Sequence, residues 1–400
     1  TTGVENSQTV SCVVSDGTTS LGAVTGTISS NAVTITSGSL STLAEGLLTV
    51  TCNVSDAAGN PATAGTDTAT KDTVAPSAPG ITSVAGDTTG TRYINDSEKG
   101  AVVITGTAES GSTVSVTLTD TTAETPLTIT GTDTADGDGF SITLNTESPS
   151  DLIDGAITIS ATATDPAGNE SSGFVFSDTI TKDTSAPDAP TIGSFTATGG
   201  TVVADTINST NTGFTLGFTS PASNYEGTAH LYLGGVDLAT PVTIAVGAAN
   251  TSYTLTGDST AITNLGEDGT KSLTVVIVDA AGNVSTASVA EEITLDQGIP
   301  TINSVALGED EYINATDVTS VNIVINTTGV EDSQTVSCVV SDGTTSLDAV
   351  TGTISSSTVT IASGSLSTLA EGLLTVTCDV SDAAGNPATV GTDTATKDTV

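Results

Sequence analysis

The sequence contains a long internal repeat. Residues 1–74 reappear as residues 327–400, and the two copies differ at 7 of 74 positions. Near-verbatim self-similarity at a fixed period is typical of repeat proteins, in which one structural unit is copied along the chain. We therefore expect the chain to be part of a longer protein in which a 326-residue unit recurs. The differing pairs are Asn6/Asp332, Gly22/Asp348, Asn31/Ser357, Ala32/Thr358, Thr36/Ala362, Asn53/Asp379 and Ala64/Val390.

A shorter period lies inside this unit. The pattern Asp-x-Ala-Gly-Asn occurs four times, in steps of 103 to 114 residues, and each copy is followed by a marker of the type Lys-Asp-Thr. A proline follows each of the first three markers, and proline cannot continue a β-ladder, so these positions indicate short linkers. The markers are residues 71–73, 182–184, 295–297 and 397–399, and the prolines are Pro76, Pro187 and Pro300. The predicted domains are residues 1–76, 77–187, 188–299 and 300–400.

Short alternating segments predict strands along the whole chain. Residues 113–118 and 140–144, for example, alternate apolar side chains with Thr or Ser, and no segment shows convincing helical spacing. Only 36% of the residues are hydrophobic and 3% aromatic, with no Trp or Met, so each core has to be thin. About seven strands in roughly 100 residues is typical of the immunoglobulin fold. We predict an all-β chain of tandem immunoglobulin-like seven-strand β-sandwich domains in an elongated array, with domain 1 lacking strand A and most of strand B.

The motifs resemble those of a known family. The Asp-x-Ala-Gly-Asn element, the Lys-Asp-Thr-x-Ala-Pro linkers at residues 71–76 and 182–187, and the runs at 93–95 and 104–107 are similar to those of bacterial immunoglobulin-like tandem repeats in giant, type I-secreted RTX-type surface adhesins. The resemblance covers essentially the whole chain, although residues 188–299 depart from it by ending in Leu-Asp-Gln. It implies a secreted, extracellular protein at the bacterial cell surface, repeats that act as stalks, and calcium as a cofactor.

The chain is strongly acidic. It contains 46 Asp and Glu against 6 Lys and Arg, which gives a net charge of -40. Such a charge repels nucleic acid and anionic membrane surfaces and attracts divalent cations. No run of about 18 apolar residues is present that could span a bilayer. We therefore expect no nucleic-acid binding and no direct membrane insertion, and calcium is the partner that the charge favours.

Acidic and amide side chains are predicted to gather at the linkers. In a sandwich of alternating strand direction, the loops after strands B, D and F lie where the chain enters the domain, so Asp165 and Asn169 would face linker residue Asp72. Calcium binds six to eight oxygen ligands from such side chains, whereas the alternative is that they only cap turns. A second candidate, residues 133–139, lacks the distal Glu of an EF-hand. The predicted ligands are Asp72, Asn95, Asp96, Glu98, Asp154, Asp165, Asn169, Asp183, Asp205, Asn208, Asp268, Asp279, Asn283, Asp296, Asp382 and Asn386.

The four cysteines occur only in the duplicated segment. Cys12 and Cys52 alternate in phase with apolar neighbours on the predicted strands C and F, as do Cys338 and Cys378. Strands C and F are adjacent in this fold, so we predict one disulfide within each pair in an oxidising compartment. The alternative is two free buried thiols, because a buried Cys packs well as a small hydrophobic residue.

We interpret the chain as the stalk of an adhesin. Carboxylates that meet at a linker repel each other, so bound calcium would stiffen the joint, and the stalk would present a distal adhesive region for cell attachment or biofilm formation. Its partners would be calcium, the neighbouring repeats and, through regions outside residues 1–400, host or surface glycans. The alternative is a glycan-binding module in domain 3, which clustered exposed aromatic rings would favour. The rings in question are Tyr225, His230, Tyr232 and Tyr253.

Enzymatic activity is not expected. His230 is the single histidine, and no Cys or activated Ser lies close to it in sequence. Acidic pairs such as Asp136 and Asp138 lack the aromatic platforms and the cleft-forming loop that a glycosidase needs.

Overall fold

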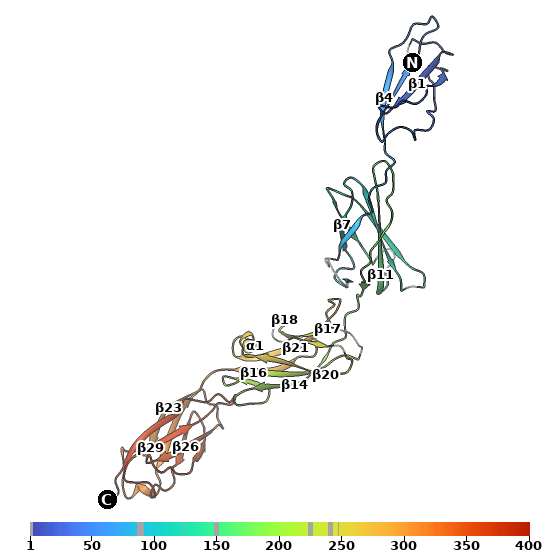
Figure 1. Cartoon of the computed structure of the whole chain (residues 1–400). Coiled ribbons are helices and arrows are strands. Elements are labelled where there is room, and N and C mark those ends of the chain that lie inside the picture. The colour runs from blue at the N-terminus through green and yellow to red at the C-terminus, as the bar shows by residue number, and fades with distance from the viewer. Residues whose placement is uncertain are drawn as a thin grey trace. The chain divides into compact units, whose positions relative to one another are not determined.

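The computed structural model describes residues 3–85, 92–122, 124–147, 152–222, 227–238, 243–246 and 248–400 (Figure 1). The chain divides into two compact units, Thr1–Thr184 and Ser185–Val400. Each unit contains two β-sheet domains. Every sheet is made of strands from one of the four intervals 1–76, 77–187, 188–299 and 300–400. The prediction of an all-β chain of tandem β-sandwich domains is confirmed.

Domain 1 consists of a single sheet among its described residues. Its strands are β1 (Thr9–Ser15), β2 (Val24–Thr27), β3 (Gly46–Asn53) and β4 (Gly65–Lys71). They are ordered β2-β1-β3-β4, and all neighbours are antiparallel. These strands correspond to C′, C, F and G of the immunoglobulin fold, so the described part of domain 1 has no counterpart of the sheet formed by strands A, B and E.

Domain 2 is a complete two-layer sandwich. Its strands are β5 (Gly80–Val84), β6 (Arg92–Ile94), β7 (Val102–Thr107), β8 (Thr113–Asp120), β9 (Thr128–Thr134), β10 (Gly139–Leu144), β11 (Gly155–Thr164), β12 (Phe174–Val175) and β13 (Ile180–Lys182). One sheet is β10-β7-β5 and the other is β6-β13-β11-β8-β9, with β12 beside β11. In β8, Val114, Val116 and Leu118 are fully buried and the Thr and Ser between them are more exposed, which is why this sequence forms a half-buried strand.

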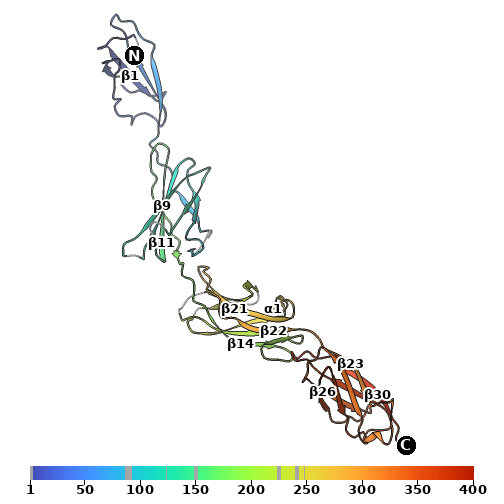
Figure 2. The same cartoon turned by 180° about the vertical axis from the view of Figure 1, so that it is seen from behind.

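Domain 3 has the same two layers and one added helix. Its elements are β14 (Thr191–Thr198), β15 (Thr206–Asn208), β16 (Gly213–Thr219), β17 (Gly227–Leu233), β18 (Val236–Asp237), β19 (Thr243–Val246), β20 (Ser252–Asp258), α1 (Ser259–Asn264), β21 (Gly269–Asp279) and β22 (Glu291–Asp296). The sheets are β14-β16-β20 and β15-β22-β21-β17-β18, with β19 beside β17. The view from behind shows β14 in one layer and β21 and β22 in the other (Figure 2).

The helix α1 differs from the prediction that no segment is helical. The carboxylate of Asp258 caps it by accepting hydrogen bonds from the backbone N atoms of Thr260 and Ala261, and Ala261 and Ile262 are buried. Six residues are too few to show a helical period, so the sequence pattern missed it. In the part of the chain that the structure describes, neither α1 nor the 3-10 helix of domain 4 has the length and apolar character that crossing a bilayer requires.

Domain 4 contains a second sheet, which the described part of domain 1 lacks. Its elements are β23 (Thr301–Leu307), β24 (Tyr312–Ile313), a 3-10 helix (Asp317–Thr319), β25 (Asn322–Thr328), β26 (Thr335–Ser341), β27 (Val350–Thr353), β28 (Thr358–Ala362), β29 (Gly372–Asp379) and β30 (Gly391–Lys397). The sheet β24-β30-β29-β26-β27 contains the four strands that domain 1 also has. The sheet β23-β25-β28 packs against it and completes the core.

Strand A of domains 2, 3 and 4 is divided between the two sheets. Its first half (β5, β14 or β23) pairs antiparallel with strand B, and its second half (β6, β15 or β24) pairs parallel with the last strand. Each first half contains a register shift, the bulge that allows a strand to bend away from its sheet. This split adds a strand to the predicted seven, and it places the first and last strands of each domain side by side.

Candidate functional site at the interdomain linkers

The C-terminal end of domain 1 is held by an acidic clasp. Lys71 ends β4, and its Nζ donates to the Leu43 carbonyl oxygen at 2.6 Å and to Glu45 Oε1 at 2.9 Å. Glu45 also accepts from Thr73, at 2.9 Å from the backbone N and at 2.8 Å from Oγ1. The hydrogen bonds from Lys71 and Thr73 lower the pKa of Glu45 below its ordinary value, so the carboxylate stays ionised at neutral pH. One acidic side chain therefore binds both the strand end and the first linker residues.

Domain 2 repeats the clasp with an aspartate. Lys182 Nζ lies 2.9 Å from Asp154 Oδ1, and the backbone N of Thr184 donates to Asp154 Oδ2 at 3.0 Å. Burial of Asp154 raises its pKa, but the hydrogen bonds from Lys182 and Thr184 outweigh burial and leave the pKa lowered. Lys182 is buried, and a buried ammonium group needs such a partner. Asp154 was predicted as an uncompensated calcium ligand, and in the structure its charge is paired with that of Lys182.

Domain 4 shows the clasp a third time. Lys397 Nζ donates to the Leu369 carbonyl oxygen at 2.6 Å and lies 3.3 Å from Glu371 Oε1, while the Thr399 backbone N donates to Glu371 Oε2 at 2.9 Å. Hydrogen bonds from Thr399, followed by Lys397, lower the pKa of Glu371. The Lys and Thr of the Lys-Asp-Thr marker thus share one role. Sequence reasoning missed it, although an acid directly before the Gly that begins each of β3, β11 and β29 was the available signal.

Domain 3 departs from the clasp where its sequence departs from the marker. Leu295 stands where the other domains have Lys, and it is fully buried in the domain core. The backbone N of Gln297 donates to Asp268 Oδ1 at 2.9 Å, and Asp296 Oδ1 accepts from the Gly298 N at 3.0 Å. The acid of the turn is therefore retained, but it binds the linker backbone without a lysine.

The Asp-x-Ala-Gly-Asn element forms the loop that meets the preceding linker. In domain 2, Asp165 accepts hydrogen bonds from the backbone N atoms of Ala167 and Asn169 and from the Asn169 Nδ2, at 2.8 to 2.9 Å. The Asn169 side chain is the main cause of the lowered pKa of Asp165. Gly168 has a φ of 95°, a conformation that favours glycine. The loop is a capped turn that fixes the direction of the Asn amide.

The fixed amide reaches the linker of the domain before it. Asn169 Nδ2 donates to the carbonyl oxygen of Asp72 at 3.1 Å, and Asn386 Nδ2 donates to the carbonyl oxygen of Asp296 at 3.1 Å. Two different linkers therefore make the same contact with the domain that follows. In these two markers, the loop Asn binds the backbone of the middle residue and not its carboxylate, so the sequence could not show this contact.

The junction between domains 3 and 4 has further bonds. Asn208 Nδ2, at the end of β15, donates to the Ala384 carbonyl oxygen at 2.8 Å, and the Ser209 backbone N donates to Asn386 Oδ1 at 2.6 Å. Asn208 and Asn386 are both fully buried. A Cβ added to Gly385 would lie 3.0 Å from Asn208 Nδ2, so the glycine is also required by the close approach of domain 3. The two domains bury matched polar groups against each other.

Part of the predicted calcium ligand set is brought together at these junctions. Asp72 lies at Asn169, and Asn208 and Asp296 both lie at Asn386, as the loop assignment predicted. Among the described residues, however, no group of three or more Asp, Glu, His or Cys side chains is placed to hold a metal ion. The junction oxygens fit calcium in type but not in number. The ligand roles stay a prediction.

The other predicted ligands take part in local structure. Asn95 Oδ1 accepts hydrogen bonds from the backbone N atoms of Ser97 and Glu98, and Asp96 pairs with Lys99 at 2.7 Å. The second candidate loop connects β9 to β10, which lie in different sheets, and Asp133 Oδ2 accepts a hydrogen bond from the Ser141 N at 2.9 Å. The remaining predicted ligands cap turns or donate or accept through the backbone: Asp183, Asp205, Asp279, Asn283 and Asp382.

The rings of domain 3 do not form an exposed cluster in the part that the structure describes. Tyr253 stacks on Phe218 with ring centroids 5.5 Å apart and packs against the core. Tyr232 is half-buried, and Tyr225 lies outside the described residues. His230 lies on β17, with Nδ1 3.0 Å from Asp237 Oδ2 and Nε2 2.9 Å from Thr228 Oγ1. This arrangement does not favour the glycan-binding alternative.

Both predicted disulfides are confirmed. Cys12 is directly opposite Cys52 on β1 and β3, and Cys338 is directly opposite Cys378 on β26 and β29. Each bond therefore joins neighbouring strands C and F of one sheet. The alternative of free buried thiols is wrong, since the described residues contain no free cysteine.

Comparisons with known proteins find matches among solved structures. The chain is 22% identical to a calcium-stabilized adhesin with which an Antarctic bacterium reaches out and binds ice, over 99% of this chain and 91% of that one, with a TM-score of 0.36. It is 22% identical to a tetra-tandem repeat in the extending region of a large adhesion protein, over 100% and 94%, with a TM-score of 0.27. It is 21% identical to a structure from a 1.5-MDa bacterial ice-binding adhesin, over 82% and 99%, with a TM-score of 0.31. No protein-family model and no curated protein matches the chain.

Proposed function

We propose that the chain is a structural extender, or stalk, of a bacterial surface adhesin that carries a distal adhesive region away from the cell. The observation that carries this proposal is the linker that two domains hold at once. Its Lys and Thr bind the acidic turn of the preceding domain, and its Asp carbonyl oxygen accepts from the loop Asn of the following domain. A flexible tether would leave these backbone groups to water.

The free energies involved are sufficient to restrict a linker. A hydrogen bond contributes about 0.5–1.5 kcal/mol, and an ion pair with an exposed carboxylate contributes about 0–1 kcal/mol because solvent screens it. At the linker after domain 1, a charged lysine contact is combined with contacts from Thr73, and the Asn169 amide adds a further bond on the other side. In a tandem array, each domain needs to contact only its neighbours, so repeating one junction extends the stalk without new interactions.

Calcium is proposed as an additional stiffener of the junctions. The residues that would hold it are Asp72 and Asp165 at one linker and Asp296 and Asp382 at another, all of which supply oxygen. When bound, calcium would neutralise part of the net charge of -40 where chain segments meet. Extracellular location at the bacterial surface and the lack of enzymatic activity belong to the same proposal.

Small-angle X-ray scattering on the full chain tests the proposal. Asn386→Ala removes the amide that binds the Asp296 carbonyl oxygen, and we expect a broader distribution of interatomic distances at unchanged secondary structure. Asn60→Ala is the matched control, because Asn60 makes the same bonds to Asp56 in domain 1 but has no described bond to a preceding linker. Identical profiles for the two variants would contradict the stalk proposal.

A second pair of profiles separates calcium from the hydrogen bonds. The wild-type chain is measured in millimolar calcium and in chelator, with magnesium at the same ionic strength as the control. A stiffer particle in calcium alone supports the cation part of the proposal. Coincident profiles overturn that part and leave the hydrogen-bonded linkers as the only stiffening element.

A further inference from the structure

The two disulfides occupy equivalent positions in domains 1 and 4 but have different surroundings. Cys338 and Cys378 are both fully buried in domain 4, whereas Cys12 is 7% exposed and Cys52 is more exposed still in domain 1. The strands that carry each pair have nearly the same sequence and the same register. Access to the sulfur atoms is therefore set by other parts of the domain.

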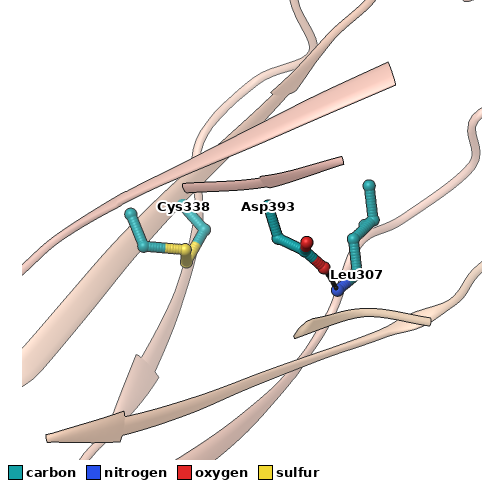
Figure 3. Close-up of a disulfide and its surroundings, with 4 residues drawn as sticks. Leu307, Cys338 and Asp393 are labelled. Carbon is teal, nitrogen blue, oxygen red and sulfur yellow. Dashed lines mark hydrogen bonds between the residues drawn. A yellow bond between two sulfur atoms is a disulfide. The ribbon is translucent and has the colours of Figure 1, made fainter. Parts of the chain in front are cut away.

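The cover over the domain 4 disulfide is the sheet β23-β25-β28. Leu307, Ile323 and Ile325 from β23 and β25 are buried in the same core as the two cysteines. Asp393 on β30 links the two sheets. Its Oδ2 accepts a hydrogen bond from the backbone N of Leu307 on β23, at 2.8 Å and beside the disulfide (Figure 3). In domain 1 the counterpart of Asp393 is Asp67, whose Oδ1 accepts from the backbone N of the next residue.

The fold also determines which strands would move first under tension. The chain enters domain 4 through β23 and β24 and leaves it through β30, and β24 pairs with β30 in parallel. Force applied to the two ends of the domain therefore acts directly on these strands. The disulfide lies between β26 and β29, inside the part of the chain that the force reaches last. It closes a loop between two cysteines that are 40 positions apart.

We propose that Cys338–Cys378 is a tension-gated cross-link: the sheet β23-β25-β28 shields it from thiols while domain 4 is folded, and removal of that sheet opens it to exchange. The closed loop of 40 positions holds back about 130–140 Å of extended chain, at ~3.3–3.5 Å per residue. Only the source of the tension rests on the proposed stalk function, since the shielding is a property of the fold.

The exchange itself needs an external thiol of the dithiol class. Its thiolate attacks one cysteine sulfur, the S–S bond breaks, and the electron pair leaves on the other cysteine as a thiolate. The second thiol of the reagent then closes on the mixed disulfide and releases the first cysteine. Both cysteines end reduced, the reagent ends as a cyclic disulfide, and the 40-position loop becomes free to extend.

Domains 2 and 3 provide internal controls. The positions that match the cysteines are Val116 and Ala161 in domain 2 and Leu231 and Val275 in domain 3, which are also directly opposite each other on strands C and F. These domains have similar sandwiches and no cross-link. Their extension should not depend on reducing agent.

Reduction kinetics on the full chain test the shielding without any force. The oxidised chain is exposed to dithiothreitol in native buffer, quenched with an alkylating reagent and digested for mass spectrometry. Peptides of the two copies are distinguishable because Gly22 is replaced by Asp348 and Asn53 by Asp379. We expect Cys12–Cys52 to be reduced at least about tenfold faster than Cys338–Cys378, because the second bond requires local opening. Denaturant should bring the two rates together, and equal rates in native buffer would overturn the proposal.

Single-molecule stretching of the same chain tests the gating. Without thiol, the unfolding of domain 4 should lengthen the chain by about 130–140 Å less than the unfolding of the same domain with its disulfide reduced. With dithiothreitol present, a delayed second step of that length should follow the unfolding of domain 4. A single full-length step from domain 4 without thiol, or a delayed step before the domain unfolds, would contradict it. Neither result bears on whether the linkers are stiff, so the stalk proposal and the cross-link can fail separately.

Discussion

Domains 1 and 4 have almost the same sequence over 74 residues but differ in what they bury. Val376 is fully buried in domain 4, whereas its counterpart Val50 in domain 1 is half-buried. Residues 358–362 form strand β28, but the equivalent residues 32–36 form no strand. The difference arises because domain 4 contains β23 and β25, which have no described counterpart in domain 1.

This comparison separates local from long-range determinants of the fold. Strands C, C′, F and G form in both domains with the same register, so their hairpins depend on their own sequence and on each other. Strand E forms only where strand B provides its hydrogen-bonding partner, as in the pairing of β25 with β28. The apolar residues Val33 and Ile35 are present in domain 1, but without that partner they do not become a strand.

The largest expected effect concerns the core that the two domains do not share. Ile361→Ala should destabilise domain 4 by about 2–5 kcal/mol, because Ile361 is buried and its removal leaves a cavity. Ile35→Ala in domain 1 should cost much less, since Ile35 is half-buried and water can replace the lost atoms. Urea unfolding of the full chain, followed by site-resolved NMR signals of each domain, measures both. Equal losses would show that the open face of domain 1 is covered.

A second prediction concerns the clasp that the two domains do share. Lys397→Met and Lys71→Met should each destabilise their domain by about 1–3 kcal/mol, because each leaves a leucine carbonyl oxygen and a glutamate without their charged donor. Similar losses measured by the same unfolding experiment would show that the clasp works without strands A and B. A loss in domain 4 alone would mean that the clasp depends on them.

A smaller difference in stability is expected for Asp393, the aspartate that binds the backbone N of Leu307. Asp393→Ala should cost domain 4 about 1 kcal/mol, because it removes the acceptor for the Leu307 backbone N. Asp67→Ala should have little effect on domain 1, where the hydrogen bond described for this side chain is to the adjacent residue. Hydrogen exchange of the Leu307 amide provides a direct measurement. Unchanged protection in Asp393→Ala would exclude the aspartate as the residue that holds this amide.

The smallest effect should be the pH dependence of the clasp. Glu45 and Glu371 have lowered pKa values in the folded chain, so each stabilises the folded state above the unfolded pKa of about 4.3, and this contribution is lost as the pH falls through the lower folded pKa. We expect the Thr73 and Thr399 amides to stay protected from pH 7 to about 5 and to lose protection only below about pH 4. Glu45→Gln and Glu371→Gln are the controls, since neither can titrate. Loss of protection already near pH 6 would contradict the assignment.

The strands and the disulfides could be predicted from the sequence, whereas the split of strand A and the helix α1 could not. Alternation in segments such as 113–118 depends on one residue and its immediate neighbours, and the opposed positions of the cysteines follow from the order of strands in the fold. The split of strand A depends on a bulge that pairing across the sheet creates, and no local signal marks it. The helix α1 was missed because it is shorter than the window that shows a helical period.

The chemistry of the junctions was only partly predicted. Loop positions brought Asn208, Asp296 and Asn386 together, as expected from strand direction. The sequence showed their side-chain types but not that Asp296 is bound through its carbonyl oxygen. It also showed the excess of acid but not that Lys182 lies 2.9 Å from Asp154. Distances of this kind decide whether a carboxylate is free for a cation, and a sequence does not contain them.

The measurement that tests the central claim most directly is NMR relaxation of backbone amides in domains 3 and 4 of the full chain. If the linker at Asp296 is held by both domains, the two domains should share one rotational correlation time, and Asn386→Ala should give domain 4 a shorter one of its own. Independent tumbling of the two domains in the wild-type chain would contradict the account, because bonds that do not restrict the joint cannot make a stalk.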